Sequence, residues 1–233
     1  MPGMKILALE TSTESGSCAL LLGEHLSERR CPAGRPHSET LLPLIRELLA
    51  ESSVKLAQLD AIAFGAGPGA FTGLRVACGV AQGLAVGAGL PVVPVVPVCG
   101  LEAMAATVGA PRVFSLLDAR MGEIYAAAYE LCDGAYALNG SVHVVAPESL
   151  DLPEGGNWVA AGNALAAHPR LAATLQVAGF SLRPEVLPQA AAIARLAARR
   201  PQAQIDPALA APLYIRDKVA KTISERLGEG GRA

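Results

Sequence analysis

The segment GAGPGA, residues 65–70, has the residue types of a phosphate-binding loop. It lies between a predicted strand, 60–64, and a predicted helix, 72–87, and such a turn can offer backbone N–H groups to an anion. A dinucleotide site also needs an acidic residue about 20 positions further on, and residues 61–101 contain no Asp or Glu. Pro68 removes one backbone donor. The sequence therefore disfavours dinucleotide binding, and the lack of a following GK[ST] excludes a Walker A loop.

Two other polar segments could do chemistry. The hydroxyl-rich ETSTES, residues 10–15, could contact a phosphate, or it could form a polar turn whose hydroxyls bond their own backbone. DARMGEIY places Asp118, Arg120 and Glu123 around a second turn, where a catalytic carboxylate and a local Asp–Arg pair are alternatives. The four histidines are isolated, and HxxxH, HExxH and GxSxG patterns are absent from the sequence. Metal hydrolysis and serine-nucleophile chemistry therefore have no local support.

The predicted helix 72–87 carries Gly79, Gly83 and Gly87 four residues apart, so all three share one face. Each glycine costs a helix about 1 kcal/mol relative to alanine. Three in register suggest that something packs very close to this face. That neighbour is either a partner protein or, as the intramolecular alternative, the chain's own sheet or its predicted helix 38–51.

The segment 183–226 is locally basic, with eight basic residues against four acidic ones. Such a run is typical of a solvated face, and contact with RNA or with an acidic partner is the functional alternative. The whole chain has 19 basic and 21 acidic residues, a formal charge of −2. This balance argues against a protein whose main task is to grip nucleic acid through its phosphates. It is compatible with membership in a complex that does so.

A chain of 233 residues, 52% of them apolar, can bury a large core as one domain or as two lobes. Five scattered cysteines without a CxxC pair indicate a reducing compartment rather than a disulfide framework or a zinc site. The first apolar run is too short for a secretory leader, and the longer ones are broken by Gly or Pro. We expect a soluble cytoplasmic protein with no membrane span.

The periodicity predicts three strands, a helix, a strand, a helix and a strand, which is the order of a ribonuclease-H-like lobe. A second unit begins near Pro111, and we expect an N-terminal lobe, 1–110, fused to a smaller C-terminal lobe, 111–233, with a helical segment and a frayed tail. The predicted strands are 5–9, 17–22, 24–30, 60–64, 91–98, 113–117, 124–129, 141–145 and 158–161, and the predicted helices are 38–51, 72–87, 100–107 and 185–200.

Four segments of the chain together resemble the TsaB (YeaZ) family of bacterial tRNA threonylcarbamoyladenosine biosynthesis proteins. They are ILALETSTESGSCALL, HSETLLPLIRELL, FGAGPGAFTGLRVACGVAQGLA and PLYIRDKVAKT, and DARMGEIYAA fits the family as well. The resemblance extends from Lys5 to about Thr222, and PGAFTGLR is its specific part.

The resemblance implies an α/β fold of two ribonuclease-H-like lobes of the actin/Hsp70/sugar-kinase (ASKHA) type, with a cleft between them. It also implies a role in placing threonylcarbamoyl on N6 of the adenosine beside the anticodon of tRNA. In that system the transferase is the paralogue TsaD, and TsaB is its required partner alongside the ATPase TsaE. We therefore expect a TsaD-type and a TsaE-type partner, a homodimer when the chain is alone, contact with tRNA only through the complex, and no cofactor.

One departure from the TsaD pattern bears on catalysis. TsaD-type proteins carry an HxxxH metal motif, and when it is laid on PVVPVCGLEAMA its histidines fall on Gly100 and Met104. Glycine has no ligand atom, and a thioether is a poor ligand for a hard or borderline cation. The resemblance therefore implies a chain with no metal and no catalytic residue. Glu10 stands where kinase-like relatives have a DxGT-type phosphate loop, which weighs against nucleotide hydrolysis.

Two functions follow from these features. The first is a non-catalytic scaffold whose helices 38–51 and 72–87 form the surface that pairs with TsaD. The alternative is an ATP-using kinase or hydrolase of the two-lobe ASKHA class, with its site in the cleft between the lobes. If the chain is a scaffold, this cleft is a vestigial nucleotide site. The expected partner-interface residues are Leu41, Leu42, Ile45, Leu48, Arg75, Val76, Gly79, Gly83, Val86 and Gly87, and the expected cleft residues are Glu10, Thr11, Ser12, Gly67, Gly69 and Asp118.

Overall fold

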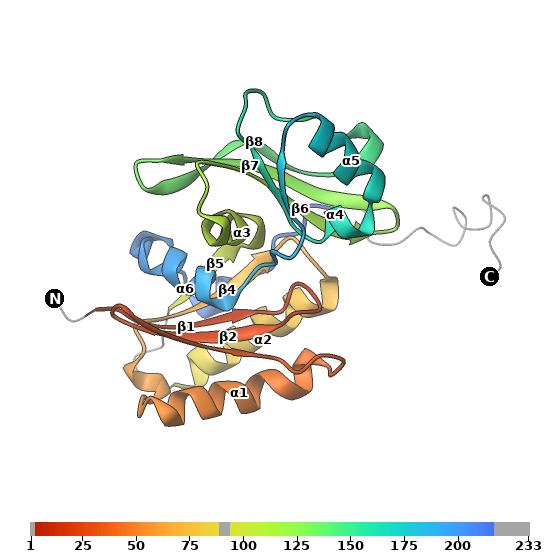
Figure 1. Cartoon of the computed structure of the whole chain (residues 1–233). Helices are drawn as coiled ribbons and strands as arrows, with labels where there is room; N and C mark the ends of the chain where they lie inside the picture. The colour runs from red at the N-terminus through yellow and green to blue at the C-terminus, as the bar shows by residue number, and fades with distance from the viewer. Residues whose placement is uncertain (1–2, 89–93, 217–233) are drawn as a thin grey trace, which may run out of the picture.

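The computed structural model describes residues 3–88 and 94–216, and its elements stack in alternating layers of helices and sheets (Figure 1). The first sheet has the strand order β3-β2-β1-β4-β5. Strands β1 to β3 form an antiparallel meander, and β4 and β5 run parallel to β1. The strands are β1 (Lys5–Glu10), β2 (Ser17–Leu22), β3 (His25–Arg30), β4 (Ala61–Gly67) and β5 (Val95–Cys99).

The second sheet repeats this arrangement with the order β10-β9-β6-β7-β8. Its first three strands are again an antiparallel meander, and the last two are parallel to β6. The predicted fold of two ribonuclease-H-like lobes is therefore confirmed. The strands are β6 (Arg112–Arg120), β7 (Glu123–Cys132), β8 (Ala135–Val145), β9 (Val159–Ala161) and β10 (Ser181–Arg183).

Helices fill the three remaining layers. Helices α1 and α2 cover one face of the first sheet, α3 and α6 lie between the two sheets, and α4 and α5 cover the far face of the second sheet (Figure 1). The helices are α1 (His37–Glu51), α2 (Phe71–Gly87), α3 (Gly100–Val108), α4 (Ala164–Ala167), α5 (Pro169–Val177) and α6 (Ala190–Ala198). Short 3-10 turns occupy Leu56–Gln58, Pro147–Ser149, Pro201–Ala203 and Pro207–Leu209.

Strand β1 shows how the sequence specifies these layers. Leu7 and Leu9 belong to the core beneath α1 and α2, while Ile6 and Ala8 belong to the core shared with α6. All four side chains are fully buried. A strand buried on both faces reads as a continuous apolar run instead of an alternating one, which is why ILAL was recognisable as a strand.

Several predicted boundaries are wrong. Strand β4 does not end at Phe64, because its pairing with β5 continues as far as Gly67 and Cys99. Helix α6 begins at Ala190 and not at Glu185, because Pro188 disfavours helical backbone in the residue before it. Strand β8 starts well before residue 141; its side chains are mostly exposed, so it lacks a clear alternation. Helix α5 was not predicted.

Helix α6 follows the second sheet in sequence but packs on the first, where the backbone N–H of Ala190 donates to Ser17 Oγ at 2.9 Å. The division at residue 110 falls between α3 and β6 and stays a prediction. The predicted frayed tail and the start of the predicted strand 91–98 lie outside the described residues. Among those the structure does describe, no helix combines the length and the apolar character that a membrane crossing requires.

Candidate functional site

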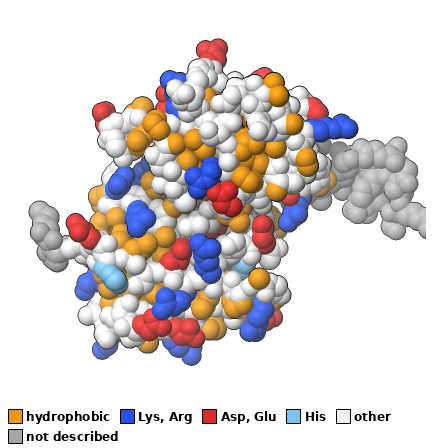
Figure 2. Space-filling model, in the orientation of Figure 1, with side chains coloured by type: hydrophobic (Ala, Val, Ile, Leu, Met, Phe, Trp, Pro, Cys, Tyr) orange, Lys and Arg blue, Asp and Glu red, His pale blue; other side chains and the backbone are white. Residues whose placement is uncertain are grey.

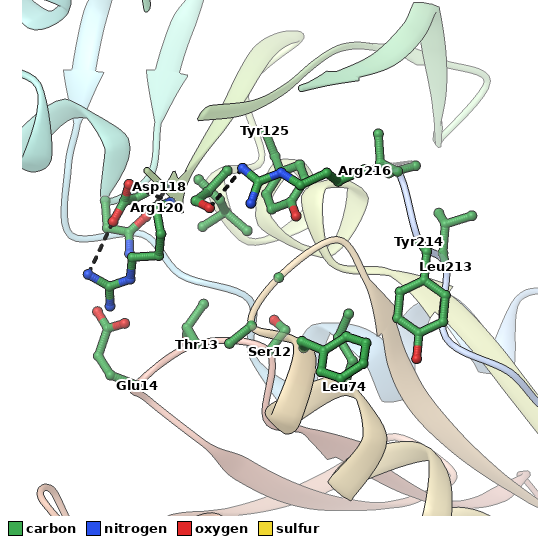
Figure 3. A pocket seen from close by; sticks show the side chains of 17 residues that line it. Ser12, Thr13, Glu14, Leu74, Asp118, Arg120, Tyr125, Leu213, Tyr214 and Arg216 are labelled. Carbon is green, nitrogen blue, oxygen red and sulfur yellow. Dashed lines mark hydrogen bonds and ion pairs between the residues drawn. The ribbon is translucent and has the colours of Figure 1, made fainter. Parts of the chain in front are cut away.

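A cavity of about 210 Å³ lies between the two lobes (Figure 3). Its walls come from the β1–β2 loop, the start of α2, the end of β6, and the segment 213–216 that follows the last 3-10 turn. Three of the six predicted cleft residues line it: Ser12, Gly69 and Asp118. The full lining is Ser12, Thr13, Glu14, Gly69, Ala70, Phe71, Leu74, Leu117, Asp118, Ala119, Arg120, Tyr125, Asn163, Leu213, Tyr214, Ile215 and Arg216.

The β1–β2 loop sits directly on the start of α2. Thr11 Oγ1 donates to the carbonyl of Gly73 at 2.7 Å, and the backbone N–H of Ala70 donates to the carbonyl of Ser12 at 2.7 Å. A Cβ at Gly69 would lie 2.5 Å from Ser12 Cβ, and one at Gly73 would lie 1.8 Å from the Thr11 carbonyl oxygen. These two glycines therefore let the β1–β2 loop lie close against the start of α2. The backbone N–H of Ala70 already donates to Ser12, so it is not free to bind a phosphate.

Glu10 lies beneath this loop, outside the lining of the cavity, and is fully buried. Its Oε1 accepts a hydrogen bond from the Ser12 backbone, while its Oε2 has no partner among the described residues. Gly65 provides the space for this carboxyl, because a Cβ there would lie 1.9 Å from Oε2. Burial raises the pKa of Glu10 above its ordinary value, against the smaller lowering effects of the Ser12 hydrogen bonds and of His37.

Replacing Glu10 with glutamine should therefore change how stability depends on pH. The folded chain keeps the Glu10 proton over a pH range in which the unfolded chain, with a pKa near 4.5, has lost it. The contribution of Glu10 to the unfolding free energy thus falls as the pH rises from about 4.5 through the folded-state pKa. Urea unfolding followed from about pH 5 upward should show Glu10→Gln gaining stability relative to the wild type as the pH rises towards the folded-state pKa of Glu10, by about 1 kcal/mol or more per pH unit.

The exposed carboxyl of Glu14 provides the control for this experiment. Glu14→Gln removes an exposed carboxyl from the same loop, so it shows how much of the effect comes from removing any carboxyl there. If the profile of Glu10→Gln ran parallel to that of the wild type, the pKa of Glu10 would not be raised.

Asp118 is held by its neighbours in the second lobe. Its Oδ1 accepts from the Arg120 backbone N–H at 3.0 Å, and its Oδ2 lies 3.3 Å from the Arg120 guanidinium. His168 Nε2 lies 3.7 Å from Oδ1, and Asn163 Oδ1 accepts from the Asp118 backbone N–H at 2.9 Å. Figure 3 shows the Asp118–Arg120 pair at one edge of the cavity. Of the two alternatives for this turn, the geometry favours the local Asp–Arg pair.

The segment 213–216 joins the two lobes across the cavity, a role that was not predicted, although Arg216 belongs to the basic run 183–226. The backbone N–H of Leu213 donates to the carbonyl of Ala66 in the first lobe at 2.7 Å. Arg216 donates to the carbonyl of Ala119 in the second lobe at 3.1 Å and pairs with Glu123. The segment is irregular, so no periodic pattern marks it; the signals in the sequence were its place in the PLYIRDKVAKT resemblance and in the basic run 183–226.

Two stripes of small residues run along α2. The inner stripe continues from Gly73 through Ala77, Ala81 and Ala85, which are fully buried against the first sheet. The outer stripe is Gly79, Gly83 and Gly87, and a Cβ at any of them would meet no heavy atom of the described residues within 4 Å, the helix's own backbone aside. The intramolecular alternative, in which these glycines press on the chain's own sheet or on α1, is therefore wrong.

Helix α2 itself carries few charges and exposes apolar side chains near the outer stripe. Val86 is 63% exposed and Leu42, on the neighbouring helix α1, is 46% exposed. Arg75, the sole charged residue of α2, lies over the ring of Phe71 at 3.8 Å and donates to the Tyr214 hydroxyl at 3.2 Å. Leu41, Ile45 and Leu48 are instead buried in the core of the first lobe. Of the ten expected partner-interface residues, seven are exposed or partly exposed: Leu42, Arg75, Val76, Gly79, Gly83, Val86 and Gly87.

The two positions where a metal motif would lie are packed inside the protein. Met104 is fully buried, and a Cβ at Gly100 would lie 3.4 Å from Pro188 Cγ. Within residues 3–88 and 94–216 there is no group of three or more His, Cys, Asp and Glu side chains that could hold a metal. These residues therefore do not fit a metal site of the HxxxH type.

Comparisons with known proteins relate the chain to the TsaD family and to TsaB (YeaZ) proteins. Residues 31–224 match the family TsaD, described as tRNA N6-adenosine threonylcarbamoyltransferase. The chain is 37% identical over 182 residues to the Escherichia coli protein named tRNA threonylcarbamoyladenosine biosynthesis protein TsaB, covering 72% of this chain and 75% of that one. It is 49% identical over 132 residues to the Haemophilus influenzae protein of the same name, covering 54% of this chain and about half, 53%, of that relative's length.

Solved structures from Pseudomonas aeruginosa extend the likeness to nearly the whole chain. The structure titled YeaZ is 37% identical, covers 91% of this chain and 99% of its own, and has a TM-score of 0.78. A second structure, of a protein described as similar to peptidase YeaZ, is 36% identical, covers 91% of this chain and 100% of its own, and has a TM-score of 0.81.

Proposed function

Because this chain belongs to the TsaB (YeaZ) family, we propose that it serves tRNA threonylcarbamoyladenosine synthesis as a non-catalytic subunit that pairs with a TsaD-type transferase. In this proposal it works in the cytoplasm alongside a TsaE-type ATPase and forms a homodimer when alone. The observation that carries the proposal is the open outer stripe of α2, where three glycines leave the helix backbone accessible from outside.

The glycine stripe suits a tightly packed protein partner. A helix without side chains on one face lets a second backbone approach more closely than the 8–10 Å usual for packed helices. Leu42, Val76 and Val86 border the stripe and would supply apolar area to the contact. Because α2 has no charged side chain besides Arg75, the α2 part of the contact would take few charged groups out of water. The same features would serve a second copy of this chain.

The absence of suitable groups at Gly100 and Met104 supports the non-catalytic part of the proposal. The interlobe cavity adds to it, since its volume of about 210 Å³ is below the range of about 300–1,000 Å³ typical of small-molecule sites. The alternative, an ATP-using enzyme, also has to place phosphates where Thr11 and Ser12 already contact the start of α2. The purified chain with ATP and Mg²⁺ should therefore release phosphate no faster than buffer.

Reconstitution of the tRNA modification tests the proposal as a whole. An unmodified tRNA transcript, the threonylcarbamoyl donor, a TsaD-type transferase and a TsaE-type ATPase would be combined with and without this chain, and the modified nucleoside measured by mass spectrometry. We expect product when all components are present and background when this chain is omitted. Equal product without the chain would contradict a required subunit, and product from this chain without the transferase would contradict a non-catalytic one.

A further inference from the structure

A groove of about 600 Å³ lies on the side of the molecule away from the outer stripe of α2, between α3, α6 and the β7–β8 hairpin. Figure 2 shows basic side chains among apolar ones in this region, at the left of the view between the hairpin and α6. None of the lining residues is acidic, and three are arginines. The lining is Ala106, Thr107, Gly109, Leu131, Gly134, Ala135, Tyr136, Gln189, Ala191, Ala192, Arg195, Leu196, Arg199, Arg200 and Gln202.

The three arginines differ in how their charge is used. Arg200 makes two hydrogen bonds to the buried carboxylate of Glu102, and this ion pair neutralises the charge of Arg200. Arg195 and Arg199 are exposed and make no ion pair with any described residue. Arg199 donates one hydrogen bond, from its NH1 atom to the carbonyl of Gly134 at 3.0 Å. That bond fixes the guanidinium at the rim of the groove and leaves its other donors available.

A structural role explains part of this pattern. Arg195 lies in the last turn of α6 and Arg199 is the residue that caps it, where positive charge interacts favourably with the helix dipole. That role accounts for basic residues at this helix end. It does not account for a wide groove whose lining has two unpaired arginines and the amide side chains of Gln189 and Gln202. The carboxylates next to the lining are already engaged: Glu102 pairs with Arg200, and Glu28 accepts from the backbone N–H of Ala191 at 3.0 Å.

We propose that this groove binds backbone phosphates of the tRNA through Arg195 and Arg199. The inference rests on the proposed function, which makes tRNA the polyanion that this chain would meet, and it adds a direct contact to the indirect one expected from the family. Guanidinium groups match phosphate in shape and can donate two hydrogen bonds at once. Because the chain carries a net charge of −2, two such contacts would orient the RNA and not by themselves hold it.

The test compares tRNA binding by the full chain and by the variant Arg195→Gln/Arg199→Gln. Fluorescence anisotropy with a labelled, unmodified tRNA transcript would be followed between about 50 and about 200 mM salt, for this chain alone and for its complex with a TsaD-type transferase. Loss of two phosphate contacts should weaken binding about tenfold at the lowest salt and make the slope of log K against log salt shallower by about 1–2.

Two variants separate this contact from general charge effects. Arg195→Lys/Arg199→Lys keeps both charges and should keep most of the affinity. Arg35→Gln/Arg170→Gln removes the same charge from exposed positions outside the groove, and should leave affinity and salt slope unchanged. The thermal midpoint of each variant would show whether the helix-dipole role alone has been lost.

The proposal is overturned if the groove variant binds tRNA as the wild type does in both forms, or if the matched pair outside the groove weakens binding equally. It is also overturned if the groove variant keeps tRNA affinity but loses affinity for the transferase, since the groove would then serve an acidic protein surface. Reconstitution with the wild-type chain keeps the two proposals apart. If modification requires the chain while the groove variant binds tRNA normally, the groove fails and the proposed function stands.

Discussion

The variant Gly83→Leu should fold normally and lose most of its ability to associate with a TsaD-type transferase. The position lies in the middle of the outer stripe, and a Cβ there meets no heavy atom of the described residues within 4 Å. The added side chain therefore starts in open space on an exposed face, and we expect the monomer to fold as the wild type does. In a complex it would occupy the space of the approaching backbone, and overpacking of this kind costs about 1–3 kcal/mol, roughly a 5- to 150-fold loss of affinity.

Affinity would be measured by analytical ultracentrifugation or by titration with the purified transferase, and folding by circular dichroism and thermal unfolding. The same runs with the chain alone would show whether the variant is monomeric at concentrations where the wild type is a dimer. Ala173→Leu is the matched control, because it adds a leucine to the exposed face of α5, in the other lobe. Unaltered association of Gly83→Leu would mean that the outer stripe is not the contact.

How well the sequence predicts a part of this fold depends on whether that part is specified by a local pattern or by contacts between distant segments. The strands of the first sheet were predictable because runs such as residues 6–9 and 61–64 are buried on both faces and are continuously apolar. Helix α1 was predictable because apolar residues recur at helical spacing, and three of them, Leu41, Ile45 and Leu48, are buried. In both cases the element packs against a neighbouring layer of the fold, and this packing produces an apolar pattern within the element itself.

The candidate site was less predictable because its geometry depends on contacts between distant segments. The glycines of residues 65–73 and those of 79–87 look alike in sequence, yet a Cβ would clash at Gly73 and meet open space at Gly83. The difference arises because the β1–β2 loop lies on one face of α2, and spacing within α2 does not reveal this. Segment 213–216 is held by Ala66 and Ala119, both far away in sequence, so a pattern within the segment could not place it.

Replacing Gly79, Gly83 and Gly87 together with alanine should stabilise the monomer while weakening its association. Each glycine costs an exposed helix position about 1 kcal/mol relative to alanine, because glycine loses more backbone entropy on folding. None of the three has the positive φ that would forbid a side chain, and each new methyl group points into open space. The triple variant should therefore gain about 2–3 kcal/mol and unfold roughly 5–10 °C higher than the wild type.

Two conditions make this experiment decisive. The chain must be monomeric during unfolding, as checked by sedimentation, because in a dimer the new methyl groups would also affect the interface. Gly73→Ala serves as the opposite control: its Cβ would lie 1.8 Å from the Thr11 carbonyl oxygen, so it should destabilise the chain by about 1–3 kcal/mol. If the triple variant were no more stable than the wild type, the outer stripe would not be open in the monomer. If it were more stable and bound the transferase with undiminished affinity, close approach of a partner could not explain why this helix carries three glycines.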